Sequence, residues 1–297
     1  MSDNMTNSTN CPEEKIISGI LVAMYSIIFI GGVIGVIVMS FTLFKSNTRS
    51  VTTTAVINLI MVHGVFLLTI PFRIMYFVKN EWILGDPFCK IVSAMIHVHM
   101  YLSLLFYMIT LVIRYLIYFK QKDKFEFYRK LHAVAASAAV WAVVVVVIFP
   151  LFFGQYGTSN TYNTSKCFHF QGEFNKLGVI ILNYIVIALV FVMVCAFLCL
   201  QVCIIVGVVR KLQGPILAHQ EFSAQMKSLF FVMVMVVCYL PYHMFRIYYL
   251  NHLSDCKIVM YNEICLSITA ISCFDMLSFM VRSNYLKQWS VCTALRK

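Results

Sequence analysis

Charged residues are scarce in this sequence. Only 12% of its 297 residues are Asp, Glu, Lys or Arg, whereas 61% are hydrophobic. An ordinary soluble domain carries about 25% charged residues. The scarcity excludes a soluble globular protein and indicates a chain that is embedded in a membrane.

Long polar stretches are lacking as well. About 20 apolar residues suffice for a helix to cross a bilayer, and seven such runs occur, at 18–44, 51–77, 88–119, 131–153, 177–209, 226–250 and 258–281. They do not alternate in polarity as the strands of a membrane barrel do. The sequence therefore predicts an all-α membrane protein with a seven-helix transmembrane bundle at 18–281. An N-terminal segment, 1–17, precedes it, and a short tail at 282–297, a candidate amphipathic helix, follows.

Acidic residues are fewer than basic ones, 12 against 23. Thirteen Lys and Arg residues fall in 45–50, 120–130, 210–219 and 282–297. Basic loops remain on the cytoplasmic side, so the N-terminus is expected outside and the C-terminus inside. The net charge of +11 calls for no nucleic-acid partner, because a basic face beside anionic membrane lipids is ordinary.

The N-terminal segment lacks the apolar stretch of a cleavable signal peptide, so the first span is expected to direct insertion. Glycosylation acceptor sequences occur at Asn4 and Asn7, and a third occurs at Asn163 between the fourth and fifth spans. All three fall on the side that the charges place outside. This pattern predicts a glycosylated, multi-pass plasma membrane protein.

Of 11 cysteines, four lie in or beside the outer segments: Cys11, Cys89, Cys167 and Cys256. Thiols outside the cell usually pair, and four cysteines allow three pairings. Cys292 lies in the basic tail after the last span and is a palmitoylation candidate.

Several short motifs are distributed along most of the chain at characteristic spacings. They are Asn58-Leu59, Trp82 with Gly85 and Cys89, Arg114-Tyr115, Trp141, and Cys238 with Pro241. Over residues 18–290 the sequence resembles the rhodopsin-like G-protein-coupled receptors. The stretches "LTIPFR", "LPYHMFR" and "SCFD" are similar to those of receptors for nucleotides and lysophospholipids. The resemblance implies a disulfide between Cys89 and Cys167, which makes Cys11 with Cys256 the natural second pair.

Several switch positions differ from the pattern of that family. Ile113 precedes Arg114 where the family has an acid, Tyr239 stands for the usual tryptophan, and Phe279 stands for the usual tyrosine of the seventh span. These differences leave the expected fold intact. They put conventional switching in doubt.

His63 also replaces an acidic residue of the family pattern. By the resemblance, this position faces Asp275 and helps to hold a sodium ion. Hard cations such as sodium prefer oxygen ligands, so we hypothesise that His63 and Asp275 pair directly in place of the ion, near Ser103. The alternative is a neutral histidine that is hydrogen-bonded to the backbone.

Arg114 lies 25 residues after Cys89, or about 37 Å along a helix at 1.5 Å per residue. Glu221 precedes Pro241 by 20 residues and falls at the same inner face. An Arg114–Glu221 ion pair is therefore expected to hold the third and sixth spans together. The resemblance implies that breaking this pair admits a heterotrimeric G protein. The alternative is an arginine that snorkels to the membrane interface.

Pro241 cannot donate a backbone hydrogen bond and is expected to bend the sixth span. His243 and Arg246 follow it on one helix face, and Arg73 follows Pro71 in the second span. Because a guanidinium suits phosphate or carboxylate, we hypothesise an outer pocket for an anionic ligand.

Arg246 is the expected chief anchor, with Arg73 and His243 beside it. His97 or His99 is a further candidate, and the expected apolar walls are Tyr101, Tyr242 and Phe245. The alternatives are structural ion pairs of Arg246 with Glu263 and of Arg73 with Glu81. Ile96 stands where amine receptors keep an acid, which disfavours a biogenic amine.

The sequence lacks the features that are typical of other classes of membrane protein. No lysine occurs between 258 and 281 for a retinal Schiff base, and no internal repeat suggests a transporter. His97 and His99 are about 200° apart on a helix and do not share one haem site. No catalytic constellation is visible, so neither enzyme activity nor a cofactor or metal is expected. The resemblance predicts a receptor that signals to G proteins; the alternative is a non-coupling or constitutively active receptor-like protein that acts through partner receptors.

Overall fold

The computed structural model describes residues 14–45, 51–119, 126–148, 167–168, 176–211, 219–252 and 256–277. The predicted glycosylation sites, one cysteine of the second disulfide, one switch position and the palmitoylation candidate lie outside these ranges. They stay predictions: Asn4, Asn7, Asn163, Cys11, Phe279 and Cys292.

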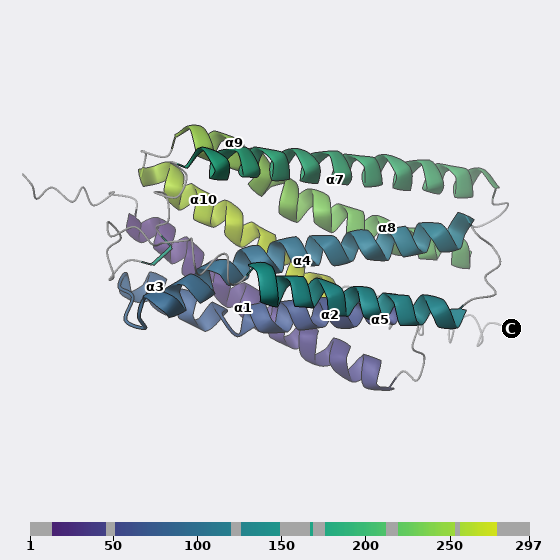
Figure 1. Cartoon of the computed structure of the whole chain (residues 1–297), viewed down its shortest axis with the longest axis horizontal. Coiled ribbons are helices and arrows are strands. Elements are labelled where there is room, and N and C mark those ends of the chain that lie inside the picture. The colour runs from purple at the N-terminus through teal and green to yellow at the C-terminus, as the bar shows by residue number, and fades with distance from the viewer. Residues whose placement is uncertain are drawn as a thin grey trace, which may run out of the picture.

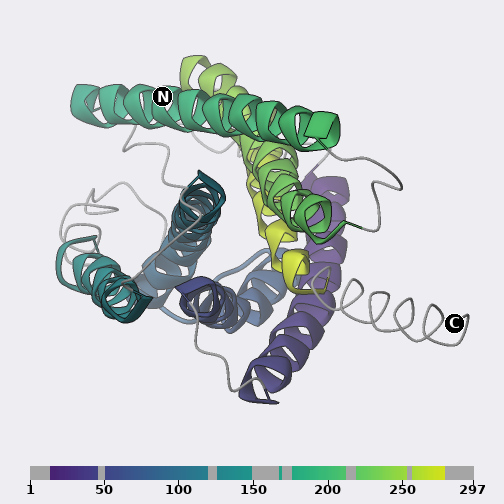
Figure 2. The same cartoon turned by 90° about the vertical axis from the view of Figure 1, so that its right-hand side faces the viewer.

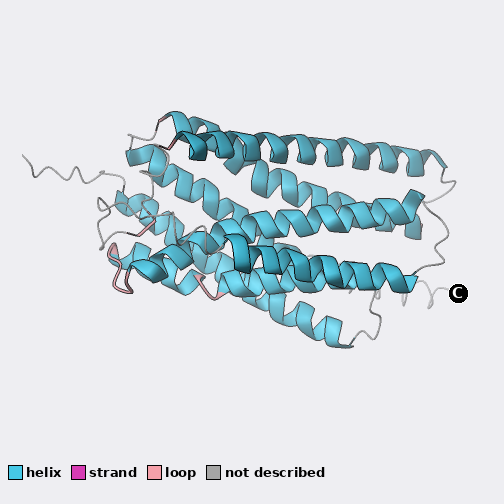
Figure 3. Ribbon diagram, in the orientation of Figure 1, coloured by secondary structure: helices cyan, strands magenta, loops and turns pink. Residues whose placement is uncertain are grey.

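The elements assigned in these ranges are all helical (Figure 3). In chain order they are α1 (Glu14–Lys45), α2 (Val51–Leu67), α3 (Ile70–Lys79), α4 (Asp86–Phe119), α5 (Glu126–Val143), η1 (Val144–Ile148), α7 (Leu177–Lys211), α8 (Gln220–Val234), η4 (Met235–Tyr239), α9 (Leu240–Asn251), α10 (Cys256–Thr269) and η5 (Ala270–Phe274).

Six helical segments of the described residues are long and apolar enough to cross a membrane. A shorter apolar helix, Val134–Val146, lies where the fourth span is predicted. Together they correspond to the seven predicted spans. Large apolar side chains such as Ile27, Ile30 and Ile34 are exposed along α1, as expected for a helix that is surrounded by lipid rather than water.

Most helices run roughly along the long axis of the molecule (Figure 1), and the end-on view shows that α7 and α1 are strongly tilted against it (Figure 2). α2 packs against α1, α4 and α5, α7 packs against α8 and α9, and α10 packs against α1 and α9. We call the end that holds α3, the start of α10 and Cys89 the disulfide end. The start of α8 and the end of α4 lie at the opposite end.

Two spans change their helical geometry beside a proline. In the second span α2 ends at Leu67, the Thr69 hydroxyl donates to the Phe66 carbonyl at 2.7 Å, and α3 begins just before Pro71. In the sixth span the π-helical turn η4 comes directly before α9, whose second residue is Pro241. Prolines and π-helical turns are the usual causes of helix kinks. The irregularity before Pro241 lies where the sequence predicts a bend, whereas the break beside Pro71 was not predicted.

Glycines let α1 approach its neighbours closely. A Cβ atom at Gly31 would overlap the Phe274 ring of η5, and one at Gly32 would lie 2.7 Å from the Leu67 side chain of α2. Small residues serve this purpose at helix contacts in membranes. The contact holds η5 against α1, and η5 supplies part of the polar core described below.

Candidate ligand-binding site and polar core

A disulfide joins Cys89 of α4 to Cys167, with their Cα atoms 5.7 Å apart. This confirms the predicted pair. The next residue, Phe168, has a positive φ of 69° and packs against the rings of Tyr76, Phe77 and Trp82. The disulfide and these ring contacts hold residues 167–168 against α3 and α4.

Arg73 of α3 is almost fully buried, at 1% exposure. Its Nη1 lies 3.6 Å from Oε2 of Glu263 on α10, and its Nη2 donates to the Val92 carbonyl of α4 at 3.0 Å. Its guanidinium also lies 4.4 Å from the centre of the Phe168 ring, within cation–π range. Arg73 therefore braces α3, α4, α10 and the disulfide segment. Its acidic partner is Glu263 rather than Glu81, the partner considered from the sequence.

Arg246 of α9 is also buried, at 7% exposure. Its Nη1 donates to Asn262 Oδ1 of α10 at 3.2 Å, and its Nε donates to Asn183 Oδ1 of α7 at 3.4 Å. The guanidinium carbon lies 4.8 Å from the Tyr249 ring centre and 5.9 Å from that of Tyr242. These two hydrogen bonds and the two rings fix the position of the guanidinium between α7, α9 and α10.

His243 lies beside Arg246 and is also buried, with its Nδ1 2.8 Å from the Tyr239 carbonyl. Its ring packs edge-on against Tyr242 at 5.1 Å and Tyr101 at 6.1 Å. Tyr101 is 38% exposed, which makes it the most accessible of this group. The structure thus brings together four of the side chains that the sequence predicts as ligand contacts.

Two further predicted contacts lie differently. His97 is half-buried, with its Nδ1 3.2 Å from the Ser93 carbonyl. Phe245 packs instead against a separate apolar cluster of Ile187, Tyr249, Leu250, Ile258 and Val259. Phe245 therefore joins α9 to α7 and α10 and does not face His243.

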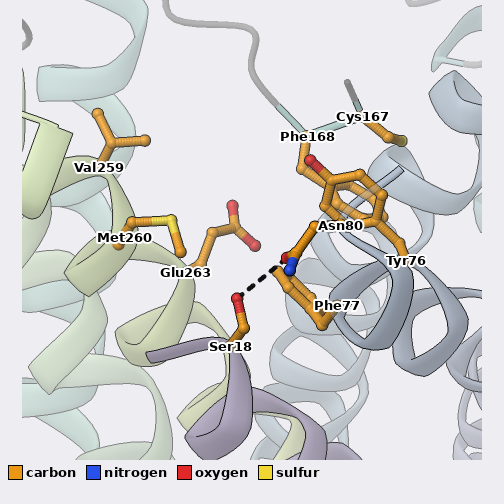
Figure 4. Close-up of a pocket in the computed structure, with 9 residues that line it drawn as sticks. All are labelled: Ser18, Tyr76, Phe77, Asn80, Cys167, Phe168, Val259, Met260 and Glu263. Atoms are coloured by element: carbon orange, nitrogen blue, oxygen red, sulfur yellow. Dashed lines mark hydrogen bonds between the residues drawn. The ribbon is translucent and has the colours of Figure 1, made fainter. Parts of the chain in front are cut away.

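One pocket at the disulfide end lies between α1, α3, α10 and residues 167–168 (Figure 4). The Ser18 hydroxyl donates to Asn80 Oδ1 at 3.4 Å, and the Glu263 carboxylate points toward the middle of the pocket (Figure 4). The side chains around it are those of Ser18, Tyr76, Phe77, Asn80, Cys167, Phe168, Val259, Met260 and Glu263. This pocket thus adjoins the Arg73–Glu263 pair and contains no side chain that the sequence analysis assigns to the ligand.

Three contacts at this end were not predicted from the sequence. They are those of Asn183 and Asn262 with Arg246, and that of Glu263 with Arg73. Asn183, Asn262 and Glu263 are polar residues within apolar runs, and such residues usually face the interior of a bundle. That signal marks them as interior residues, but it does not say which arginine each one contacts.

The polar core lies deeper in the bundle and joins α2, α4 and η5 to Asp275. His63 Nε2 lies 3.4 Å from Asp275 Oδ1, and both side chains are fully buried. Tyr107 donates to the other carboxylate oxygen at 2.6 Å. The geometry places His63 and Asp275 side by side, as hypothesised. Ser103 does not bond to either of them; its hydroxyl pairs with that of Tyr239 at 2.7 Å.

Two more side chains complete this core, and the sequence analysis did not place them there. His99 Nε2 lies 2.8 Å from His63 Nδ1, and Cys273 Sγ lies 3.4 Å from the same His99 nitrogen. The His99 ring stacks on Phe66 at 4.3 Å. Because His99 belongs to the core, it is not a ligand contact at the disulfide end.

At the opposite end Arg114 contacts α8. Its Nη1 lies 3.4 Å from Ser228 Oγ and 3.5 Å from the Ala224 carbonyl, and its guanidinium lies 5.2 Å from the Phe231 ring centre. Glu221 is exposed, and the expected ion pair between Glu221 and Arg114 does not form among the described residues. Arg114 therefore links the third and sixth spans through a hydroxyl, a carbonyl and a ring.

The neighbouring Tyr115 is 6% exposed and packs against Phe197 of α7, with the ring centres 6.1 Å apart. The two residues of the Arg114-Tyr115 motif thus contact different spans, the sixth and the fifth. This end joins the three helices α4, α7 and α8.

Comparison with known proteins decides what kind of molecule carries these features. The family model described as "7 transmembrane receptor (rhodopsin family)" matches residues 35–279. This chain belongs to that family of receptors. It is 52% identical to the protein named "Probable G-protein coupled receptor 141" of Homo sapiens over 291 residues, which cover 96% of this chain and 95% of the relative.

More distant relatives carry names that state a ligand. The receptor is 27% identical to "2-oxoglutarate receptor 1" of Rattus norvegicus, over 99% of this chain and 90% of the relative. It is 29% identical to "Lysophosphatidic acid receptor 6" of Mus musculus, over 96% and 89%. The family consists of receptors rather than enzymes, and with its spanning helices this receptor is a multi-pass plasma membrane protein.

A polar contact joins two of the motifs, Asn58-Leu59 and Trp141. Asn58 of α2 donates to Ser137 Oγ at 2.8 Å and accepts a hydrogen bond from Trp141 Nε1 at 2.9 Å. Both partners lie on α5. These bonds satisfy a polar amide inside the bundle and hold the fourth span against the second.

Proposed function

We propose that this receptor binds an anionic small molecule at the disulfide end and signals to a heterotrimeric G protein at the opposite end. The observation that carries the proposal is the setting of Arg246. Its guanidinium is buried, oriented by Asn183 and Asn262, and flanked by tyrosine rings. A preorganised guanidinium suits a phosphate or carboxylate group, which it binds through paired hydrogen bonds.

The proposal places the disulfide end outside the cell, because disulfides form and persist in oxidising compartments. An extracellular anion would enter beside Tyr101, the partly exposed ring next to His243. Arg73 supports the site indirectly, since its own contacts hold α3, α4 and α10 together. In this proposal Arg246 contacts the ligand directly, and Arg73 holds the surrounding helices in place.

Two relatives support an anion. Their names state 2-oxoglutarate, a dicarboxylate, and lysophosphatidic acid, a phosphate-bearing lipid. The two ligands differ in shape and share negative charge. We infer that this receptor takes a member of the same broad class, a carboxylate or phosphate of small size or on a single lipid chain.

The signalling half of the proposal rests on Arg114. It joins α4 to α8 through Ser228 and the Ala224 carbonyl. Breaking these contacts would let the sixth span move away from the third and admit a G protein. The competing function is that of a receptor-like protein that does not couple and acts through partner receptors; the altered residues Ile113 and Tyr239 favour it.

The test is G-protein activation in cells without added ligand. Wild type, Arg114→Glu and empty vector are compared at matched surface levels. Basal signalling that Arg114→Glu abolishes supports coupling. A panel of nucleotides, dicarboxylates and lysophosphatidic acids is then tested on wild type, Arg246→Gln and Arg246→Lys. If an anionic agonist acts equally on wild type and Arg246→Gln, Arg246 is not the ligand anchor. If wild type activates no G protein with any agonist that binds it, the receptor does not couple.

A further inference from the structure

Three metal-ligating side chains converge in the centre of the bundle. His63 of α2, His99 of α4 and Cys273 of η5 are all fully buried. His63 Nδ1 lies 2.8 Å from His99 Nε2, and Cys273 Sγ lies 3.6 Å and 3.4 Å from these two nitrogens. The three ligand atoms lie within 4.8 Å of one another, and each comes from a different span.

We propose that His63, His99 and Cys273 form a binding site for one zinc ion. Zinc bonds to histidine nitrogen at about 2.0–2.1 Å and to cysteine sulfur at about 2.3 Å in tetrahedral sites. Those bond lengths put two nitrogens about 3.3 Å apart, and a nitrogen and a sulfur about 3.6 Å apart. The two nitrogen–sulfur distances already fit. The imidazoles need to separate by a few tenths of an ångström from the distance at which they now hydrogen-bond. The proton of that hydrogen bond must also move from His99 Nε2 to Nδ1 of the same ring, so that both lone pairs are free for the ion.

Asp275 orients one of the ligands. Its Oδ1 lies 3.4 Å from His63 Nε2, the ring nitrogen that is not part of the cluster. A carboxylate there favours a proton on Nε2 and leaves the lone pair of Nδ1 directed at the ion. Carboxylates behind metal-bound histidines have this role in many sites. The hydrogen bond from Tyr107 at 2.6 Å fixes the carboxylate in turn.

Charge balance favours a divalent ion at this depth. When zinc binds, the Cys273 thiol loses its proton to solvent and a zinc–sulfur bond forms in its place. The thiolate and the Asp275 carboxylate then offset the two positive charges of the ion. Two imidazoles and a thiolate are ligands that suit zinc, whereas sodium and magnesium prefer oxygen. The site would therefore exclude the hard cation that the family resemblance implies at this level.

Zinc in this position would tie three spans together. Its ligands come from α2, α4 and η5, which are the second, third and seventh spans of the receptor. Relative movement of these spans would then require a metal–ligand bond to stretch or break. The ion would stabilise one arrangement of the bundle.

The experiment uses the full receptor, purified in detergent, incubated with zinc chloride and passed over a chelating resin. Metal content is measured by mass spectrometry. One zinc per receptor is expected for wild type, with loss of that zinc in Cys273→Ser and His99→Gln. Cys265→Ser and His97→Gln are matched controls, since Cys265 lies on α10 and His97 lies on α4 outside the cluster, and both should keep the ion. Asp275→Asn should bind zinc about 10- to 100-fold more weakly.

A spectroscopic measurement on wild type avoids variants that fail to fold. Cobalt in place of zinc should produce a thiolate-to-metal charge-transfer band and the intense visible bands of a tetrahedral site. Wild type without a thiolate band, or zinc that Cys273→Ser retains in full, would overturn the proposal. Without a thiolate band, the contact between His63 and His99 would be a hydrogen bond and not part of a metal site. Zinc retained by Cys273→Ser would be bound adventitiously at the surface.

Discussion

The surroundings of Arg246 and the core around Asp275 are both polar regions inside an apolar bundle, and they differ in how completely they are enclosed. In the core, His63, His99 and Cys273 are fully buried and contact one another. Around Arg246, Tyr101 is 38% exposed and His97 is half-buried. The cation there is positioned by uncharged amides, whereas the core places a carboxylate beside a histidine.

The difference shows how one bundle separates two tasks. A fully enclosed polar cluster loses much free energy when one member is removed, because the remaining members stay buried without their partner. A partly open region with a positioned charge tolerates change better and accepts an external partner. The core should therefore govern stability, and the Arg246 region should govern ligand response.

The largest expected effect is on the core. Asp275→Ala removes the acceptor of Tyr107 and the carboxylate beside His63, and breaking a buried pair in this way costs about 3–5 kcal/mol. Thermal unfolding of the purified receptor should show a large fall in Tm. Asp275→Asn keeps an acceptor and should fall less. Equal and small losses in both variants would contradict the view that this carboxylate holds the core.

The next effect sharpens the contrast at Arg246. Arg246→Gln should lower the potency of an anionic agonist at least about 30-fold, since losing one partner of a buried charge pair costs about 2 kcal/mol or more. Its Tm should fall less than that of Asp275→Ala, because the hydrogen bonds from Arg246 to Asn183 and Asn262 run to uncharged amides. Dose–response curves and unfolding of the same preparations measure both. A large fall in Tm with unchanged potency would reverse the assignment.

Arg73 offers a matched comparison within the disulfide end. Arg73→Gln removes the contact with Glu263 and the bond to the Val92 carbonyl, with an expected cost of about 2 kcal/mol for bonds to a charged group. Unlike Arg246→Gln, it should lower stability more than it lowers ligand affinity. Ligand binding and thermal unfolding are measured on both variants, to distinguish a residue that contacts the ligand from one that holds the helices together. Identical behaviour of the two variants would show that the two arginines do not differ in role.

The smallest expected effect concerns the hydrogen bond between Tyr239 and Ser103, which are 2.7 Å apart. Tyr239→Phe keeps the ring and removes the hydroxyl, so the free energy of unfolding should fall by about 1 kcal/mol. The fall should be close to that of Ser103→Ala, and the double variant should lose little more than either single one. Additive losses in the double variant would show that the two hydroxyls act independently.

Much of the fold was predictable from the sequence. The seven apolar runs correspond to the described spans within a few residues at most ends, because a bilayer sets a minimum length for an apolar helix. Pro241 marked the break in the sixth span, since proline cannot donate the helical hydrogen bond; the break beside Pro71 in the second span was not predicted. The Cys89–Cys167 bond also followed the pattern. The predicted Arg114–Glu221 ion pair does not form among the described residues, because a common depth in the bundle does not specify a rotamer or a partner.

What the sequence by itself determined is therefore membrane residence, the number and place of the spans, and which polar side chains had to face the interior. Only the tertiary structure decided the partners: Glu263 for Arg73, Asn183 and Asn262 for Arg246, and Cys273 with His99 for His63. The physical reason is that the two kinds of information extend over different parts of the chain. Hydropathy is summed along one helix, whereas each of these contacts depends on the rotation and depth of two or three helices that are remote in the chain.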